Sequence, residues 1–349
     1  MGGVHPTILP EEAIQHCDSV VVGEAEGVWE TLIRDVENDE LKSRYHEPFP
    51  DLDTYVPKDF SQVLRKGYFK LVPIMTTRGC PYNCDFCCVT NLFGRKIRHI
   101  PIKNAVRDIV ESKGKNFMFL DDNIIGHPKY AKELFRAIKP LKIHWVGQAS
   151  LSFVKDMELM QLAAESGCKA LFIGLESVSI EQLKTMRKSI KDIKDLEEAL
   201  RKIKKMKILI HASMIFGFDN DNKEVFEETV DFLIRNKIST VSFNVLTPYP
   251  GTKTYDDLKN AGRIITDNWR YYDHNTVVYQ PAKMSPFELQ MGKTRARRRF
   301  YKVSSVLKRF TGNMYNPLIY LATNYGNMKQ TIIEARRNQR LKNELFTQL

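Results

Sequence analysis

Four of the six cysteines lie within nine residues, at Cys80, Cys84, Cys87 and Cys88. The first three are spaced C-x3-C-x2-C, and three thiolates from one short loop suit an iron–sulfur cube, because such clusters favour soft sulfur ligands. A [4Fe–4S] cube normally takes four ligands, so one iron keeps an open position, as a catalytic metal site requires. The alternative is structural zinc completed by Cys88 or His99, but zinc modules usually have a second cysteine pair, which this sequence lacks.

Short apolar, β-branched runs alternate with amphipathic segments from about residue 70 onward. Near-continuous apolar strands separated by helices indicate a parallel sheet covered by helices. Six units are visible, which favours an α/β fold with a partial (β/α)6 barrel of TIM type over a closed eight-unit barrel. The predicted strands are Lys70–Thr77, Asn116–Leu120, Ile143–Gly147, Ala170–Leu175, Ile208–Phe216 and Thr240–Leu246. The predicted helices are Lys103–Ser112, Lys129–Ile138, Lys155–Glu165, Asp192–Lys205 and Lys223–Arg235.

Polar residues follow two of these strands, where the catalytic loops of such a barrel lie. Asp121, Asp122 and Asn123 end the second strand, and Gln148 ends the third. Adjacent strand residues face opposite sides, so only one of the two aspartates is expected to reach the site. For either aspartate the alternative is an Asx turn leading to Pro128.

The cysteine motif, with Phe86 directly before the third cysteine, resembles the signature of radical S-adenosylmethionine (radical SAM) enzymes. The resemblance covers about residues 70–258. It implies a [4Fe–4S] cluster on Cys80, Cys84 and Cys87 whose free iron chelates SAM. One electron then splits SAM into methionine and a 5′-deoxyadenosyl radical, which abstracts hydrogen from the substrate. The protein positions these groups and excludes water.

The same resemblance assigns further SAM contacts, residue by residue. Relatives bind the SAM amino group at the end of strand two, often with a Gly-Gly-Glu that this chain lacks. A carboxylate after strand four can accept both ribose hydroxyls, although a salt-bridged loop glutamate is the alternative there. Lys188 falls where relatives contact the SAM carboxylate, and its alternative is a solvated helix end. A glycine after strand five lets the backbone approach adenine. The expected cofactor-binding residues are Phe86, Asp121, Asp122, Asn123, Gln148, Glu176, Ser177, Lys188, Gly217 and Leu246.

Residues 1–45 resemble the last strand–helix unit of the cobalamin-binding domain that precedes the barrel in the B12-binding subgroup. The turn-rich stretch Gly2–Thr7 precedes a predicted strand, Ser19–Val22, and a predicted helix, Glu26–Val36. One strand and one helix cannot bury a core alone. The earlier units, with the loop that supplies the lower cobalt ligand, are not in this sequence. We therefore expect no tight cobalamin binding, which puts methyl transfer through methylcobalamin in doubt. Residues 46–66 are predicted to be a linker and 67–283 the barrel.

The net charge of +11 comes almost entirely from residues 284–349, which hold 13 basic and three acidic side chains. This region is predicted to be helical, with a domain boundary near Pro286. Its apolar residues share one helical face with a basic stripe beside it. They are Leu289, Ala296, Phe300, Val303, Leu307 and Phe310, and the stripe is Arg295, Arg298, Lys302 and Arg309. The simplest interpretation packs the apolar face on the barrel and leaves a solvated basic face. A peripheral membrane contact is favoured slightly over RNA.

Composition and the ends of the chain limit the other classes of protein. No apolar run approaches the ~18 residues of a membrane span, and the first residues do not resemble a signal peptide. We expect a cytoplasmic enzyme with a small-molecule or lipid-like substrate, and its basic C-terminal region is the part expected to make any peripheral membrane contact. An electron donor such as flavodoxin or ferredoxin is implied by the resemblance. An RNA-modifying enzyme and a zinc-stabilised binding protein are the alternatives.

Overall fold

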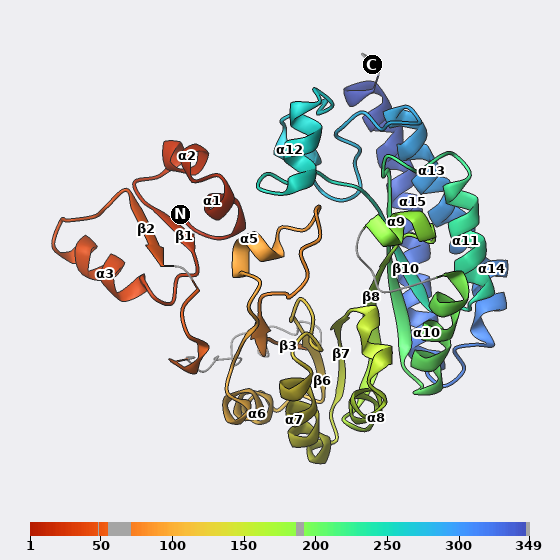
Figure 1. Ribbon diagram of the computed structural model, residues 1–349, viewed down its shortest axis with the longest axis horizontal. Helices are drawn as coiled ribbons and strands as arrows, with labels where there is room; N and C mark the ends of the chain where they lie inside the picture. The colour runs from red at the N-terminus through yellow and green to blue at the C-terminus, as the bar shows by residue number, and fades with distance from the viewer. Residues whose placement is uncertain (48, 55–70, 186–191, 347–349) are drawn as a thin grey trace.

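A six-stranded parallel sheet forms the centre of the computed structural model, which describes residues 1–47, 49–54, 71–185 and 192–346 (Figure 1). The strand order is β10-β9-β8-β7-β6-β3, so each strand lies beside its neighbour in sequence and the barrel stays open between β3 and β10. This confirms the predicted α/β partial barrel. The strands are β3 (Val72–Ile74), β6 (Asn116–Phe119), β7 (His144–Ala149), β8 (Cys168–Glu176), β9 (Leu209–Phe216) and β10 (Thr240–Val245).

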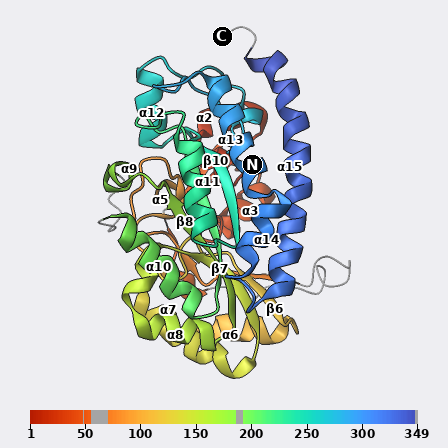
Figure 2. The same cartoon turned by 90° about the vertical axis from the view of Figure 1, so that its right-hand side faces the viewer.

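Five helices follow the strands and pack on the outer face of the sheet (Figure 2). Each begins within two residues of its predicted start, because its apolar residues recur at helical spacing. Large side chains such as Phe117, Phe119 and Trp145 are fully buried between the sheet and these helices. The helices are α6 (Ile102–Glu111), α7 (Pro128–Ile138), α8 (Met157–Glu165), α10 (Ile193–Lys205) and α11 (Val225–Arg235).

The inner face of the sheet is less covered than the outer face. Along β6 exposed and buried residues alternate, because successive strand side chains point to opposite faces. Met118 is 44% exposed and Leu120, just after the strand, is 50% exposed. The concave side of the open barrel therefore presents apolar side chains to solvent.

The N-terminal residues form a small unit of their own. Strand β1 (Val20–Gly23) pairs in parallel with β2 (Arg44–Glu47), and α3 (Trp29–Glu37) connects them. The prediction of one strand was incomplete, since β2 spans the predicted boundary at residue 45. Gly2–Thr7 was expected to be turn-rich, but α1 (Val4–Ile8) occupies most of it, because proline is tolerated in the first turn of a helix.

Ion pairs and hydrogen bonds attach this unit to the barrel. The Glu24 carboxylate, 6% exposed, forms ion pairs with both Arg78 and Arg98 at the base of the cysteine loop. On the other side of the opening, Trp269 Nε1 donates a hydrogen bond of 2.9 Å to Glu12 Oε1. The N-terminal unit thus contacts segments that follow both the first and the last strand of the sheet.

The C-terminal region is helical, as predicted, and begins at Pro286. Ser285 and Glu288 form a capping box that starts α13. The prediction of one continuous apolar face was wrong, because α13 ends at Phe300 and α14 begins at Val303 in a new direction. Leu289, Ala296 and Phe300 are buried, whereas Val303 and Leu307 are exposed. The helices are α12 (Lys253–Asn260), α13 (Pro286–Phe300), α14 (Val303–Phe310) and α15 (Pro317–Leu345).

The predicted basic stripe was also partly wrong, since Arg309 is fully buried. Its guanidinium donates to the backbone oxygens of Ile238, Ser239 and Phe300 at 2.9, 2.7 and 3.0 Å. A guanidinium has five donors, so it can satisfy carbonyls of a loop and of a helix at once. None of the described helices is both long and apolar enough to cross a membrane.

Candidate functional site

The cysteine loop is closed by a short antiparallel hairpin rather than by a strand of the central sheet. Strand β4 (Thr77–Arg78) pairs with β5 (Arg98–His99). Gly79, directly before Cys80, has φ +93°, and a Cβ there would lie 2.7 Å from the carbonyl oxygen of Lys96. Only glycine fits this turn without displacing the loop. Helix α5 (Val89–Phe93) follows the cysteines, so the loop is held at both ends.

The thiols of Cys80, Cys84 and Cys87 fit an iron–sulfur cluster in burial and electrostatics. All three are half-buried, and none of the six cysteines is in a disulfide. Burial raises the pKa of the Cys87 thiol to about 12, and the neighbouring Cys84 and Cys80 add to the shift. Thiols held together away from water ionise only when positive charge compensates them, which cluster iron supplies.

The structure gives no support to the zinc alternative. Within the described part of the chain, which includes Cys88 and His99, no three His, Cys, Asp or Glu side chains converge on a point that one metal ion could occupy. A zinc site requires four ligands around one ion, whereas the thiolates of a cluster bind different irons. Cys88, expected to be a packed thiol, is half-buried and precedes α5.

The two aspartates after β6 have different surroundings. Asp121 is 2% exposed and accepts hydrogen bonds from the hydroxyls of Thr76 and Thr77 at 2.7 and 2.6 Å. It ties β6 to the start of the cysteine loop, and its burial raises its pKa. Asp122 is half-buried, and burial together with Asp121 raises its pKa to about 6. The Asp122 charge also raises the pKa of Cys88, so this carboxylate lies near the cysteine loop.

Hydrogen bonds that involve backbone groups join the segment that contains Asn123 to the segment that contains Gln148. Asn123 is buried, and its Oδ1 accepts a hydrogen bond of 3.2 Å from the backbone N–H of Ser150. The backbone oxygen of Gln148 accepts from Ile124 N–H at 3.0 Å, while the Gln148 side chain is exposed on the inner face. Asn123 therefore joins two loops, and Gln148 remains available to a ligand.

Strand β8 ends in a distorted segment at Glu176. The register with β9 shifts between Gly174 and Glu176, and Glu176 has φ +68°. A bulge and a left-handed residue at a strand end redirect a side chain, and such strain is found at binding sites. Ser177 is buried, and its Oγ accepts a hydrogen bond of 3.0 Å from Ser179 N–H. Ser177 thus supports the turn that carries Glu176.

Gly217 has φ +103°, and side chains of this protein fill the space where its Cβ would lie. A Cβ at Gly217 would lie 2.2 Å from the hydroxyl oxygen of Tyr279 and 2.7 Å from Leu289 Cδ2. The Tyr279 hydroxyl donates to the Gly217 oxygen. This packing already requires glycine at position 217, and the approach of its backbone to adenine stays a prediction. Lys188 lies outside the described residues.

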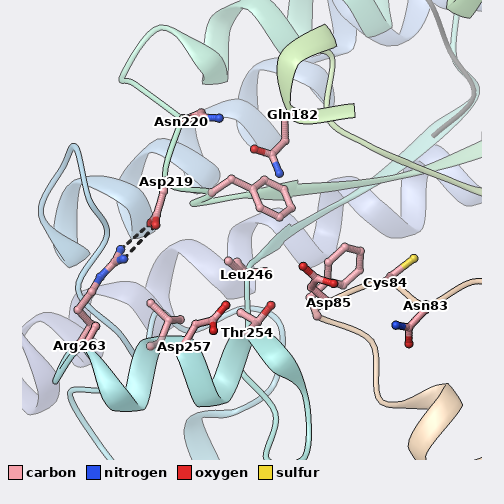
Figure 3. A pocket seen from close by; sticks show the side chains of 14 residues that line it. Asn83, Cys84, Asp85, Gln182, Asp219, Asn220, Leu246, Thr254, Asp257 and Arg263 are labelled. Atoms are coloured by element: carbon pink, nitrogen blue, oxygen red, sulfur yellow. Dashed lines mark hydrogen bonds and ion pairs between the residues drawn. The ribbon is translucent and has the colours of Figure 1, made fainter. Parts of the chain in front are cut away.

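A cleft of about 500 Å³ opens beside the cysteine loop and contains two of the predicted contacts, Phe86 and Leu246 (Figure 3). Cys84 lies at one end of it, and the ion pair between Arg263 Nη2 and Asp219 Oδ1, at 2.7 Å, lies at the other. Asp85 and Asp257 add acidic groups to the lining. The cleft is large enough for a small-molecule ligand.

A polar wall on the inner face of β9 and β10 was not predicted from the sequence. His211 has its two ring nitrogens 2.9 Å from the hydroxyls of Thr240 and Ser242. Asn244 Nδ2 donates to Ser213 Oγ at 3.2 Å. Burial and the Arg297 charge lower the pKa of His211 to about 4, so its ring is neutral at physiological pH. The signal was alternation, since polar residues recur at every second position of β10 and at His211 and Ser213 of β9.

Comparison with known proteins agrees with this arrangement. The family model described as the radical SAM superfamily matches residues 74–233. The chain is 36% identical to bacteriochlorophyllide d C-12(1)-methyltransferase of Chlorobaculum tepidum over 90% of this chain and 71% of that protein. It is 29% identical to bacteriochlorophyllide d C-8(2)-methyltransferase of the same organism, over 97% of this chain and 79% of that protein.

Solved structures share the fold at low sequence identity. The cobalamin-dependent radical enzyme OxsB, with aqua-cobalamin bound, superposes with a TM-score of 0.67 at 15% identity, over 98% of this chain and 67% of that chain. The methyltransferase TsrM of Kitasatospora setae, with cobalamin and a [4Fe–4S] cluster, gives a TM-score of 0.63 at 18% identity, over 83% of this chain and 66% of that chain. With the cysteine loop, the open six-stranded barrel and the 36% identical relative, the chain belongs to the radical SAM superfamily.

Proposed function

We propose that this protein binds a [4Fe–4S] cluster through Cys80, Cys84 and Cys87, cleaves SAM reductively and abstracts hydrogen from a hydrophobic substrate of the tetrapyrrole class. The observation that carries the substrate class is the 36% identity over 90% of the chain to a bacteriochlorophyllide methyltransferase. When bound, the cluster and SAM supply one-electron cleavage of the sulfonium and a 5′-deoxyadenosyl radical that removes the hydrogen atom.

The residues of this chain bind and orient SAM. Asp122, whose charge acts on Cys88 in the cysteine loop, accepts hydrogen bonds from the SAM ammonium group. Glu176, redirected by the bulge of β8, accepts from the ribose hydroxyls. Phe86 and Leu246 line the cleft and exclude water from the adenosyl group. The acidic lining of the cleft stabilises a cationic sulfonium.

The inner face of the sheet suits a large substrate with both apolar and polar parts. Met118 and Leu120 offer exposed apolar surface on one side. Ser242 and Asn244 offer hydroxyl and amide groups on the other side. A one-electron donor such as flavodoxin or ferredoxin would supply the electron that the cleavage of SAM consumes.

RNA modification receives less support from the C-terminal region than its charge suggested. Arg309 and Lys293 are fully buried and Arg297 nearly so, which leaves fewer cations for phosphates. Nucleic acid is therefore the weaker alternative.

The substrate class is tested by hydrogen transfer. Reconstituted protein is incubated anaerobically with SAM, a reductant and a tetrapyrrole deuterated at its peripheral alkyl groups, and 5′-deoxyadenosine is analysed by mass spectrometry. We expect the tetrapyrrole to accelerate 5′-deoxyadenosine formation and deuterium to appear in it. A hopanoid lipid and an RNA oligonucleotide are the comparison substrates. Deuterium transfer from either of them, with none from the tetrapyrrole, would contradict the proposal.

A further inference from the structure

Helix α15 has an inverted pattern, with polar side chains on its buried face. Asn324, Thr331, Glu334 and Asn338 recur at helical spacing and are all nearly or fully buried. Asn324 Nδ2 donates to the Ser239 oxygen at 3.1 Å. These side chains form hydrogen bonds or ion pairs with other parts of the protein, so polar contacts hold the helix on the barrel.

Glu334 is the strongest of these contacts. Its Oε1 lies 2.6 Å from the ammonium nitrogen of Lys293, which is fully buried in α13. Its Oε2 lies 3.4 Å from Arg297 Nε. The orientation of α15 about its own axis is thereby fixed, because turning the helix would leave a buried lysine without its counter-charge.

The opposite face of α15 is apolar and exposed. Leu318 is 81% exposed, Tyr325 is 60% and Ile332 is 59%. These positions, together with Leu321 and Ile333, fall on one stripe of the helix, directly opposite the polar buried face. Isolated exposed apolar residues are ordinary, but an apolar stripe along a helix marks an interaction site.

The charges on this face are all positive. Lys329 and Arg336 are exposed within the apolar stripe, at positions eleven and eighteen residues after Leu318. Lys308 on α14, which packs against α15, and Lys302 directly before α14 are exposed beside Leu307 and Val303. The only acidic residue between positions 302 and 335 is Glu334, whose charge points inward.

The positive charge of this face favours one kind of binding partner over the others. In a symmetric pair of copies the same patch would face itself and bring lysines and arginines together. The N-terminal unit lies on the other side of the molecule from α14 and α15 (Figures 1 and 2). An anionic lipid surface offers both negative headgroups for the cations and acyl chains for the leucine, tyrosine and isoleucine side chains.

We propose that the outer face of α14 and α15 docks on a membrane surface that contains anionic phospholipids. The helix lies in the plane of the interface, with its apolar stripe inserted among the headgroups and Lys329 and Arg336 against the phosphates. This interaction does not depend on the substrate proposed above, and its test uses no substrate.

The test is anaerobic cosedimentation of the full chain with vesicles of phosphatidylcholine, alone or containing about a third phosphatidylglycerol. We expect binding to the anionic vesicles that weakens with salt, and little binding to phosphatidylcholine alone. Each basic residue near an anionic surface contributes roughly fivefold to partitioning. The K329Q/R336Q variant should therefore bind roughly 25-fold more weakly. The L318Q/Y325Q/I332Q variant should lose at least about tenfold.

The matched control is V110Q/M157Q, which replaces two apolar residues equally exposed on other helices, at 56% and 55%. It should bind anionic vesicles like the unchanged protein. Equal binding to both kinds of vesicle, or an equal loss in the control variant, would refute the proposal. So would a dimer in analytical ultracentrifugation that the L318Q/Y325Q/I332Q variant dissociates, since this face would then bind a second copy.

Discussion

Replacing Asp122 with asparagine should make the protein more stable and bind SAM more weakly. The carboxyl group has a pKa of about 6 in the folded chain, against an ordinary value of 3.8. Each pKa unit corresponds to about 1.4 kcal/mol, so the ionised side chain opposes folding by roughly 3 kcal/mol at neutral pH. The asparagine amide is neutral but still needs hydrogen bonds, and we expect a net gain of about 1–3 kcal/mol.

The pH dependence of stability has a defined sign. Because the folded pKa lies above the unfolded one, the folded chain holds the proton more tightly. The stability associated with Asp122 is complete below pH 3.8 and is lost as the pH rises through about 6. The difference in unfolding free energy between Asp122→Asn and the unchanged protein should therefore grow across this window, as measured by urea unfolding at several pH values.

SAM binding should change in the opposite direction. Loss of a charge-assisted hydrogen bond to the SAM ammonium costs about 1.5–3 kcal/mol, or roughly 10- to 100-fold in Kd. Isothermal titration under anaerobic conditions measures this. The control is Asp121→Asn, which removes an acceptor from Thr76 and Thr77 and should destabilise the protein by about 2–4 kcal/mol. An Asp122→Asn variant that is less stable and binds SAM with unchanged Kd would refute the reasoning.

Three further predictions concern the frame around the site. Glu24→Gln leaves Arg78 and Arg98 without their shared carboxylate. It should lower the unfolding free energy by about 3 kcal/mol and reduce the iron content after reconstitution. Unchanged values in urea unfolding and in iron analysis would contradict this. Gly217→Ala should lower the unfolding free energy by about 2–4 kcal/mol, because the new Cβ meets the Tyr279 hydroxyl. Adding Tyr279→Phe removes that hydroxyl and should restore part of the lost stability. A double variant as unstable as Gly217→Ala would argue against the clash. Protein produced with cobalamin in the medium should carry none after gel filtration, as judged by its absorption spectrum, and stoichiometric retention would overturn the expectation for residues 1–45.

Much of the barrel could be predicted because parallel strands buried on one face by helices are rich in apolar, β-branched residues. The runs at β8, β9 and β10 stand out from the helices between them for this reason. The N-terminal unit was harder to predict. Strand β2, Arg44–Glu47, has three polar residues of four, and only its pairing with β1 makes it a strand.

The site was only partly predictable for a physical reason. Spacing predicts Cys80, Cys84 and Cys87, because three thiolates within one short loop can reach the irons of one cluster. Which of two adjacent aspartates is free depends on Thr76 and Thr77, which are more than forty residues away in sequence. Burial of Arg309 could not be predicted from its charge, because its partners are backbone oxygens just before β10 and at the end of α13 that only the fold brings together.

The central claim is that three cysteines, and not the fourth beside them, hold a cluster that cleaves SAM. Anaerobically reconstituted protein is incubated with SAM and a strong reductant, and 5′-deoxyadenosine is measured for the unchanged chain and for Cys84→Ala and Cys88→Ala. We expect 5′-deoxyadenosine from the unchanged chain and from Cys88→Ala, and none from Cys84→Ala. Continued formation by Cys84→Ala, or loss only in Cys88→Ala, would contradict it.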